Sequence, residues 1–279
     1  MSGLFDEPLG PVEGVMFDVD GTLILSDRKL GGYELIPGAD AFLRHLQDRG
    51  IPFLALTNGS AYPGHEQAPR LRALGLAVAD EAMLTPNDVA ARLFAARGLG
   101  RIMVLGTEGV HRALAGLGVD VAPPGAQGRF DAVYVGWHPT CSMEDIHAAC
   151  DAVFDGAALF TASDVPFFAT KHGRAFGYSS AICGAILRVT GAEPQVTGKP
   201  SLAALDLVAE RLGVARGRIA VVGDDPRVEI EMARAGGAIG IGVTTGTTSA
   251  AEWAAQPPER RPHRVVDSLP EITALELFA

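Results

Sequence analysis

Cysteine is scarce in this chain, and long apolar runs are missing. The 279 residues include three cysteines, Cys141, Cys150 and Cys183, an odd number whose spacing fits neither a zinc motif nor a disulfide framework. We therefore expect reduced, partly buried thiols. No uninterrupted apolar run approaches the roughly 18 residues that a membrane-spanning helix needs, so we expect no membrane partner.

Positive charge is also in short supply. The chain has 23 Lys and Arg against 33 Asp and Glu, which gives a net charge of −10. Because nucleic-acid binding depends on basic surface, nucleic acid is not an expected partner, whereas a small anion still fits wherever cations gather locally. Residues 1–14 have no basic start and no long apolar stretch, so they do not resemble a secretory signal, and we expect a cytoplasmic protein.

What the chain does contain is a regular alternation of apolar runs and helical stretches. A hydrophobic content of 48% and a mean hydropathy of +0.20 favour a globular protein with a large core. The helical stretches include residues 38–50 and 201–213, the latter with Ser201 as N-cap and Gly213 at its end. Strands are expected at residues 14–17, 51–57, 101–106, 131–137, 158–163, 218–225 and 238–243. This order predicts an α/β fold with a Rossmann-like, doubly wound parallel sheet.

Three of the predicted strands run directly into polar residues and glycine. These are Asp18 and Asp20, then Thr57, Asn58 and Gly59, and then Gly223, Asp224 and Asp225. In an open parallel sheet the carboxyl ends of neighbouring strands converge on one crevice, where ligands bind. Three carboxylates at one edge are enough to hold a hard cation, and Mg²⁺ is favoured because its sites combine one or two carboxylates with water and substrate phosphate.

The stretch "VTGKPS", residues 196–201, adds a positive charge at Lys199, just ahead of a predicted helix N-terminus that also favours anions. The glycines would let backbone N–H groups approach an anion, and Thr57 would add a hydroxyl donor. Taken singly, each element is ordinary: a loop, a turn or a surface lysine. Their joint occurrence at strand ends favours a phosphate site.

The stretches "DVDGTL", "LTNGS", "TGKP" and "VVGDD" resemble, in this order, the four motifs of the haloacid dehalogenase-type hydrolases. The resemblance runs over nearly the whole chain. Most of that superfamily are Mg²⁺-dependent phosphatases. The resemblance implies that Asp18 attacks phosphorus to form an aspartyl-phosphate and that Asp20 protonates the leaving oxygen and then deprotonates the hydrolytic water.

The resemblance also assigns the other motif residues. Thr57 and the backbone of Asn58 and Gly59 would hold the phosphoryl oxygens, with Lys199 balancing their charge. Mg²⁺ would be bound by Asp18, the backbone carbonyl of Asp20 and Asp224. A second aspartate often follows in the fourth motif; here that position holds Glu229, and Glu229 and Asp225 are the two carboxylates expected to support the metal ligands.

Spacing predicts the domain organisation. Asp18 and Thr57 are 39 positions apart, which leaves no room for a cap between the first two motifs, whereas Thr57 and Lys199 are 142 positions apart. We expect a catalytic core made of residues 1–98 plus 193–279, and an inserted α/β cap domain at residues 99–192. This arrangement resembles subclass IIA with its C2-type cap. The resemblance implies a homodimer through the cap as one option, which the residues themselves do not decide.

The expected cap departs from the family at one loop. Where these caps usually carry Thr-Asn-Pro-Asp, the chain has Ala162 and Ser163 before a retained Asp164. That loop commonly faces the substrate. Candidate substrate-loop residues are Asp164, Lys171, His172 and Arg174, and Phe167 and Phe168 of the same stretch could line a pocket or belong to the core. Trp137 is expected to serve packing, and the remaining histidines, His138 among them, show no ligand spacing and receive no role.

Three functions are compatible with the sequence. The leading one is a Mg²⁺-dependent phosphatase that hydrolyses a small phosphorylated metabolite. The second is a phosphotransferase or mutase using the same aspartyl-phosphate, although familiar mutase caps sit between the first two motifs, where this chain has no space. The third is a non-catalytic protein that binds a phosphometabolite; the presence of the reactive groups of all four motifs argues against it.

Overall fold

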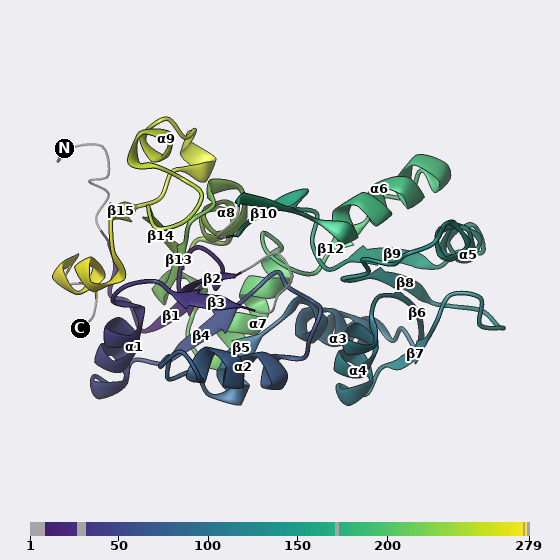
Figure 1. Cartoon of the computed structure of the whole chain (residues 1–279), viewed down its shortest axis with the longest axis horizontal. Helices are drawn as coiled ribbons and strands as arrows, with labels where there is room; N and C mark the ends of the chain where they lie inside the picture. The colour runs from purple at the N-terminus through teal and green to yellow at the C-terminus, as the bar shows by residue number, and fades with distance from the viewer. Residues whose placement is uncertain (1–8, 27–31, 171–172, 276, 278–279) are drawn as a thin grey trace.

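The computed structural model describes residues 9–26, 32–170, 173–275 and 277. In this part of the chain two parallel sheets lie next to each other, each flanked by helices (Figure 1). The predicted α/β architecture is therefore confirmed. No helix in the described residues is long and apolar enough to cross a bilayer.

The first sheet has six parallel strands with β1 near its centre. Its order is β15 (Arg264–Val266), β14 (Ile239–Val243), β13 (Ile219–Gly223), β1 (Gly14–Phe17), β4 (Phe53–Leu56) and β5 (Met83–Leu84). In register, Val15 of β1 lies between Ala220 of β13 and Phe53 of β4. Residues that are hundreds of positions apart in sequence therefore end their strands at the same edge.

Helices cover both faces of this sheet, because the side chains of β1 alternate between two cores. Val15 and Phe17 pack with α1 and α2, whereas Met16 packs on the other face with α7 and α8. Phe17 meets Phe42 of α1 edge to face, with ring centroids 5.9 Å apart. The helices here are α1 (Ala39–Asp48), α2 (Gly64–Arg72), α3 (Pro86–Arg97), α7 (Leu202–Leu212), α8 (Glu231–Gly236) and α9 (Ala250–Ala254).

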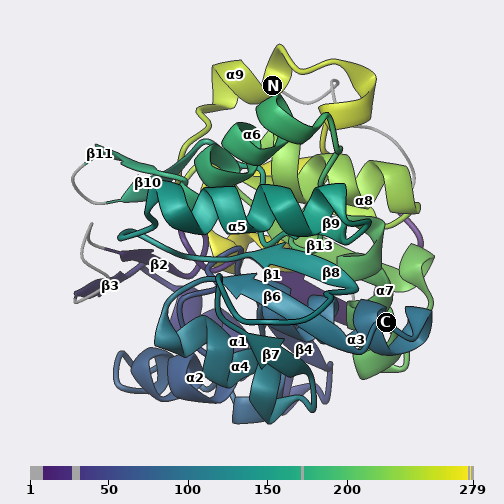
Figure 2. The ribbon, with the colours of Figure 1, turned by 90° about the vertical axis from the view of Figure 1, so that its right-hand side faces the viewer.

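The second sheet has five parallel strands, and its helices also cover both faces (Figure 2). Its order is β12 (Gln195–Val196), β9 (Ala158–Thr161), β8 (Ala132–Val135), β6 (Arg101–Leu105) and β7 (Asp120–Ala122). One face packs against α5 (Met143–Phe154) and α6 (Tyr178–Thr190), and the other against α4 (Glu108–Gly116) and α3. Two antiparallel hairpins complete the strands: β2 (Ile24–Ser26) with β3 (Tyr33–Leu35), and β10 (Phe167–Thr170) with β11 (Gly173–Phe176).

The predicted strands and helices lie where the sequence patterns place them, but several are shorter than predicted. The run at 51–57 forms a strand only over Phe53–Leu56, so the polar residues that follow it are left for the loop. The helix predicted at 201–213 is α7: the Ser201 hydroxyl accepts a hydrogen bond from the Ala203 N–H, and Gly213 ends the helix with φ of +67°. The last helical segment, Leu269–Leu275, is a 3₁₀ helix.

The division into a core and an inserted cap stays a prediction, and the strand pairing bears on its limits. Strand β12 pairs with β9 of the second sheet, so the chain returns to the first sheet after residue 196 rather than after 192. Helix α3 serves both parts, since Val89 packs in a core of the first sheet and Phe94 packs against Phe160 of the second, with ring centroids 5.1 Å apart.

The Tyr134→Phe variant tests the hydrogen bond between strand β8 of the second sheet and helix α3. The buried Tyr134 hydroxyl of β8 donates to Asn87 Oδ1 of α3 at 3.0 Å. We expect the variant to lower the free energy of unfolding by about 1–3 kcal/mol in urea denaturation, because the amide oxygen would stay buried without its donor. The matched control is Tyr33→Phe, whose partly exposed hydroxyl has a long 3.5 Å contact with Arg70. Equal losses in the two variants would contradict the prediction.

Candidate active site

The predicted polar residues gather where β1, β4 and β13 end. The Asp18 N–H donates to the carbonyl of Val222 at 2.9 Å, which continues the pairing of β1 with β13 by one residue. Asp18 and Asp224 thereby follow adjacent strands, and Thr57 follows the neighbour on the other side. A cavity of about 140 Å³ lies at this edge and is lined by Asp18, Asp20, Thr57, Asn58, Gly59, Lys199, Asp224, Asp225 and Glu229, together with residues of the second sheet's loops.

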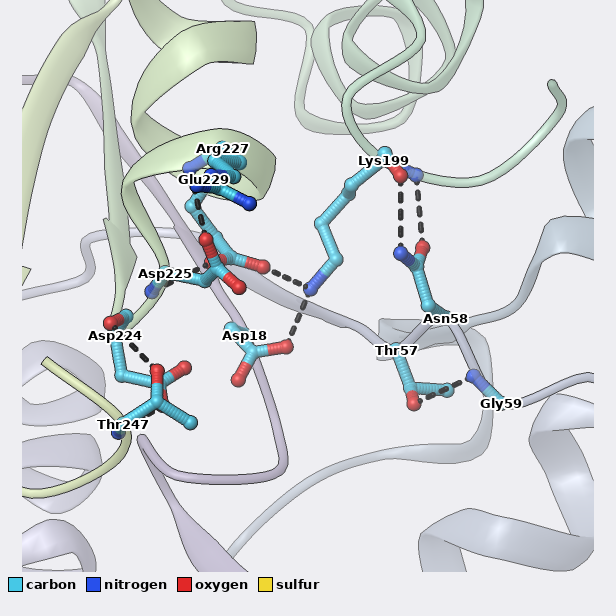
Figure 3. A network of polar contacts seen from close by, with 10 residues as sticks. All are labelled: Asp18, Thr57, Asn58, Gly59, Lys199, Asp224, Asp225, Arg227, Glu229 and Thr247. Atoms are coloured by element: carbon cyan, nitrogen blue, oxygen red, sulfur yellow. Dashed lines mark hydrogen bonds and ion pairs between the residues drawn. The ribbon is translucent and has the colours of Figure 1, made fainter. Parts of the chain in front are cut away.

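Lys199 is buried between two carboxylates. Its side chain is 1% exposed, and Nζ forms ion pairs with Asp18 Oδ1 and, at 2.8 Å, with Glu229 Oε1 (Figure 3). Burial alone would lower the pKa of Lys199, but the charges of Asp18 and Glu229 outweigh it and raise the pKa above its ordinary value. The ammonium is therefore held charged at the base of the cavity.

Asp224 is held by the loop after β14. The Thr247 N–H donates to Asp224 Oδ2 at 2.7 Å, and the Thr247 hydroxyl donates to the Asp224 carbonyl at 3.1 Å. Gly21 and Gly246 pack directly on this carboxylate, since a Cβ at either position would lie within 2.3 Å of Asp224 Oδ2. Burial, and then the charge of Asp18, raises the pKa of Asp224 to about 7.

These residues fit a hard divalent cation. Asp18 Oδ2 is buried and has no hydrogen-bond partner among the residues that the structure describes. Asp18, Asp224 and Glu229 carry three carboxylates near a single ammonium, that of Lys199, so a cation would balance the remaining negative charge. Carboxylate and carbonyl oxygens are the donors that Mg²⁺ prefers, and the ligand set of Asp18, Asp20 and Asp224 stays a prediction.

Thr57 and Gly59 form a small closed turn. Thr57 is 3% exposed, and its Oγ1 accepts the N–H of Gly59 at 2.9 Å (Figure 3). The hydroxyl hydrogen of Thr57 can therefore be donated to an anion in the cavity, whereas the Gly59 N–H is already engaged. The predicted phosphate contacts of both residues stay predictions.

Asn58 does something that the sequence did not predict. Its side-chain amide pairs with the backbone of Lys199 in both directions: Nδ2 donates to the Lys199 carbonyl at 2.9 Å, and Oδ1 accepts the Lys199 N–H at 2.8 Å (Figure 3). Gly198 makes room for this contact, because a Cβ there would lie 2.5 Å from Asn58 Oδ1. Asn58 thus positions the main chain that carries the buried ammonium.

Of the two supporting carboxylates, Glu229 lies deeper. It is 2% exposed, contacts Lys199, and accepts the Asp225 N–H at 3.2 Å. The absence of a side chain at Gly223 creates the space, since a Cβ there would come within 2.2 Å of the Glu229 side chain. Asp225 instead caps the following helical segment by accepting the Arg227 N–H at 2.8 Å.

Of the predicted substrate-loop residues, only Asp164 has a described side chain, and it does not line the cavity. Asp164 is exposed, accepts a hydrogen bond from the Ser180 hydroxyl, and lies outside the cavity lining. Lys171 and His172 lie outside the described residues, and for Arg174 only the backbone within β11 is described. Ser163, which replaces the family's proline, does line the cavity, whereas Ala162 is fully buried against the second sheet.

The cavity wall contributed by the second sheet includes one residue that sequence reasoning missed, Trp137, and one whose role it left open, Phe167. The ring of Trp137, expected to serve packing only, lines the cavity and meets Tyr178 edge to face, with centroids 4.7 Å apart. Phe167 also lines the cavity and is 51% exposed. The signal of Trp137 in the sequence was weak: it is the last residue of a predicted strand, and aromatic side chains more often serve the core. Thr247 had no sequence signal.

Comparison with known families agrees with these motifs. A family model described as haloacid dehalogenase-like hydrolase matches residues 15–120, and a second, described as HAD-hydrolase-like, matches residues 196–272. The first match contains Asp18, Asp20 and Thr57, and the second contains Lys199 and Asp224.

Individual relatives span most of the chain. The D-glycerol 3-phosphate phosphatase of Mycobacterium tuberculosis is 32% identical over 253 residues, which cover 89% of this chain and 67% of the relative. The crystal structure of 4-nitrophenylphosphatase from Thermotoga maritima has a TM-score of 0.84 at 27% identity and covers 94% of this chain and 97% of its own. A glycerol phosphate phosphatase from M. tuberculosis, solved in complex with magnesium, has a TM-score of 0.83 at 27% identity, with 95% and 78% covered.

The Lys199→Met variant tests the buried charge arrangement by itself. Removing the ammonium leaves Asp18 and Glu229 buried without their cation, so we expect the free energy of unfolding to fall by about 3–5 kcal/mol in buffer without divalent ions. Urea denaturation measures it. The matched control is Arg218→Met, which breaks an exposed ion pair with Glu13 and is expected to cost less than about 1 kcal/mol. A Lys199→Met loss no larger than the control's would contradict the prediction.

Proposed function

We propose that this chain, which belongs to the haloacid dehalogenase-like hydrolases, is a Mg²⁺-dependent phosphatase that hydrolyses small phosphomonoesters. The observation that carries the proposal is the position of Asp18. One of its oxygens is paired with the buried Lys199, the other is without a partner in the described residues, and the carboxylate lines a cavity shared with Asp20, Thr57 and Asp224.

In the first step, an Asp18 oxygen attacks the phosphorus of the bound ester. A bond forms between that oxygen and phosphorus, the bond from phosphorus to the ester oxygen breaks, and Asp20 gives its proton to the departing alcohol. The Lys199 ammonium and the Thr57 hydroxyl stabilise the charge that develops on the phosphoryl oxygens. The product of this step is an aspartyl-phosphate and a free alcohol.

In the second step, water attacks the phosphorus of the aspartyl-phosphate while Asp20, now a carboxylate, takes its proton. The bond between Asp18 and phosphorus breaks, inorganic phosphate is released, and both aspartates return to their starting states. The wall of Trp137, Phe167 and Tyr178 supports this step, because an apolar wall limits the access of other water molecules.

Asp18, the carbonyl of Asp20 and Asp224 are the residues that would hold Mg²⁺. Bound there, the ion supplies positive charge that offsets the carboxylates and the transferring phosphoryl group.

The substrate is a small phosphorylated metabolite. The relatives described above are named for phosphate esters of small alcohols and phenols, and the cavity lies between loops of the two sheets, where a small leaving group fits. A cytoplasmic location, assembly as a homodimer and the lack of a nucleic-acid partner accompany this proposal as predictions from the sequence.

The Asp18→Asn variant tests the nucleophile. We expect release of phosphate from 4-nitrophenyl phosphate to require Mg²⁺ in the wild type and to fall at least about 10³-fold in the variant, because an amide cannot form the covalent intermediate. The matched control is Asp48→Asn, an exposed residue of α1, which should keep wild-type turnover. Wild-type turnover in Asp18→Asn would contradict the mechanism. No release from a broad panel of phosphate esters by the folded wild type would contradict the function itself.

Variants of Asn58 test whether this residue acts through Lys199. Asn58→Ala removes both backbone contacts, and we expect kcat to fall about 10–100-fold, since small displacements of catalytic groups have effects of this size. Asn58→Asp keeps an oxygen that can accept the Lys199 N–H and should recover part of the loss. Equal defects in the two variants would show that the pairing with Lys199 does not account for the role of Asn58.

A further inference from the structure

A second cluster of metal-ligating side chains lies in the segment after β8 and the first turn of α5, and none of its residues lines the cavity. His138, Cys141 and Asp145 each offer one ligand atom, and these atoms lie within 4.8 Å of one another. We propose that this cluster is a site for a divalent transition-metal ion of the Zn²⁺ type. The proposal goes beyond the phosphatase function and does not depend on it.

The geometry of the three donors suits such an ion. His138 Nε2 lies 3.6 Å from Asp145 Oδ2. Bonds of about 2.0–2.3 Å to a tetrahedral Zn²⁺ place neighbouring donors roughly 3.3–3.8 Å apart, so the His138–Asp145 pair already has the required separation. The third donor, Cys141, lies within 4.8 Å of the other two and needs a shift of roughly 1 Å to join them.

The local chain holds the three residues in place, and the Cys141 thiol donates a weak hydrogen bond to the Ser142 carbonyl at 3.6 Å, which a bond to a metal would replace. Asp145 lies in the first turn of α5, where its Oδ2 accepts the Ser142 N–H at 2.8 Å as part of a capping box. The Cys141 N–H donates to the His138 carbonyl at 3.3 Å, which closes a turn between the two ligands. His138 is 15% exposed in its side chain, and its Nδ1 is buried without a hydrogen-bond partner in the described part of the chain.

The donor set selects the metal. A thiolate and an imidazole favour Zn²⁺ and its neighbours over Mg²⁺, whereas the cavity beside Asp18 offers oxygen donors only. Binding would form a bond from Cys141 Sγ to the metal and release the thiol proton to solvent. The three protein ligands leave a fourth position for water.

The site would brace one wall of the cavity. Trp137, directly before His138, lines the cavity. Its backbone N–H donates to the Ser60 hydroxyl at 2.9 Å, and its backbone carbonyl accepts the Thr107 N–H at 2.9 Å. A metal that ties His138 to α5 would restrict the loop that carries this ring.

Titration of the full-length protein with Co²⁺, in excess Mg²⁺, tests the proposal. Co²⁺ bound through sulfur gives a thiolate-to-metal charge-transfer absorption, which a site with oxygen donors cannot produce. We expect this band to saturate at one equivalent, to disappear when Zn²⁺ is added, and to be absent in Cys141→Ser. In His138→Gln, Co²⁺ affinity should fall more than about 10-fold, since loss of even an outer partner of a ligand costs 10–100-fold.

A matched control uses His147, an exposed histidine of the helix that carries Asp145. His147 of α5 is 77% exposed and lies 3.4 Å from Asp151, so it is a surface histidine–carboxylate pair outside the cluster. His147→Ala should leave the band and the affinity unchanged. Circular dichroism establishes that each variant is folded, and if Cys141→Ser is not, His138→Gln decides. A wild type without the band, or a band that survives in folded Cys141→Ser, would overturn the proposal.

Discussion

The buried ammonium of Lys199 is the constraint on which the candidate active site depends. A lysine at 1% exposure is tolerated only because Asp18 and Glu229 pair with it, and the two carboxylates are tolerated for the same reason. The three residues come from the end of β1, the loop before α7 and the segment after β13, which the parallel sheet brings together. The fold therefore supplies the pairing, and the pairing makes the buried charges acceptable.

Glycine at defined positions allows this concentration of charge. Gly21, with φ of +97°, turns the chain after Asp20 and leaves room for Asp224, and Gly246 approaches the same carboxylate from the loop after β14. Gly223 leaves the space that Glu229 fills. Any side chain at these positions would collide with a carboxylate, so the glycine of each motif is a packing requirement as well as a turn signal.

The sequence predicted seven of the strands of the two parallel sheets and the polar residues that follow three of them, because each depends on local patterns: apolar runs and polar exits. It did not predict how those residues pair. The backbone of Asn58 was assigned to phosphate, but the contact of its side chain with the backbone of Lys199, 141 positions away, was not predicted; Thr247 supports Asp224 without any motif. The His138 cluster was missed for a similar reason, since one histidine, one cysteine and one aspartate become neighbours only through the turn that precedes α5.

The contacts between the two sheets lie next to the residues of the candidate site. Ser60, which follows Gly59, holds the N–H of Trp137, and Gly198, which precedes Lys199, donates its N–H to the Ala162 carbonyl at 2.9 Å. The loops that carry the phosphate-site residues thus also carry the junction with the second sheet. A displacement of that sheet would pull on both loops at once, so the shape of the substrate wall and the position of the Lys199 ammonium are physically coupled.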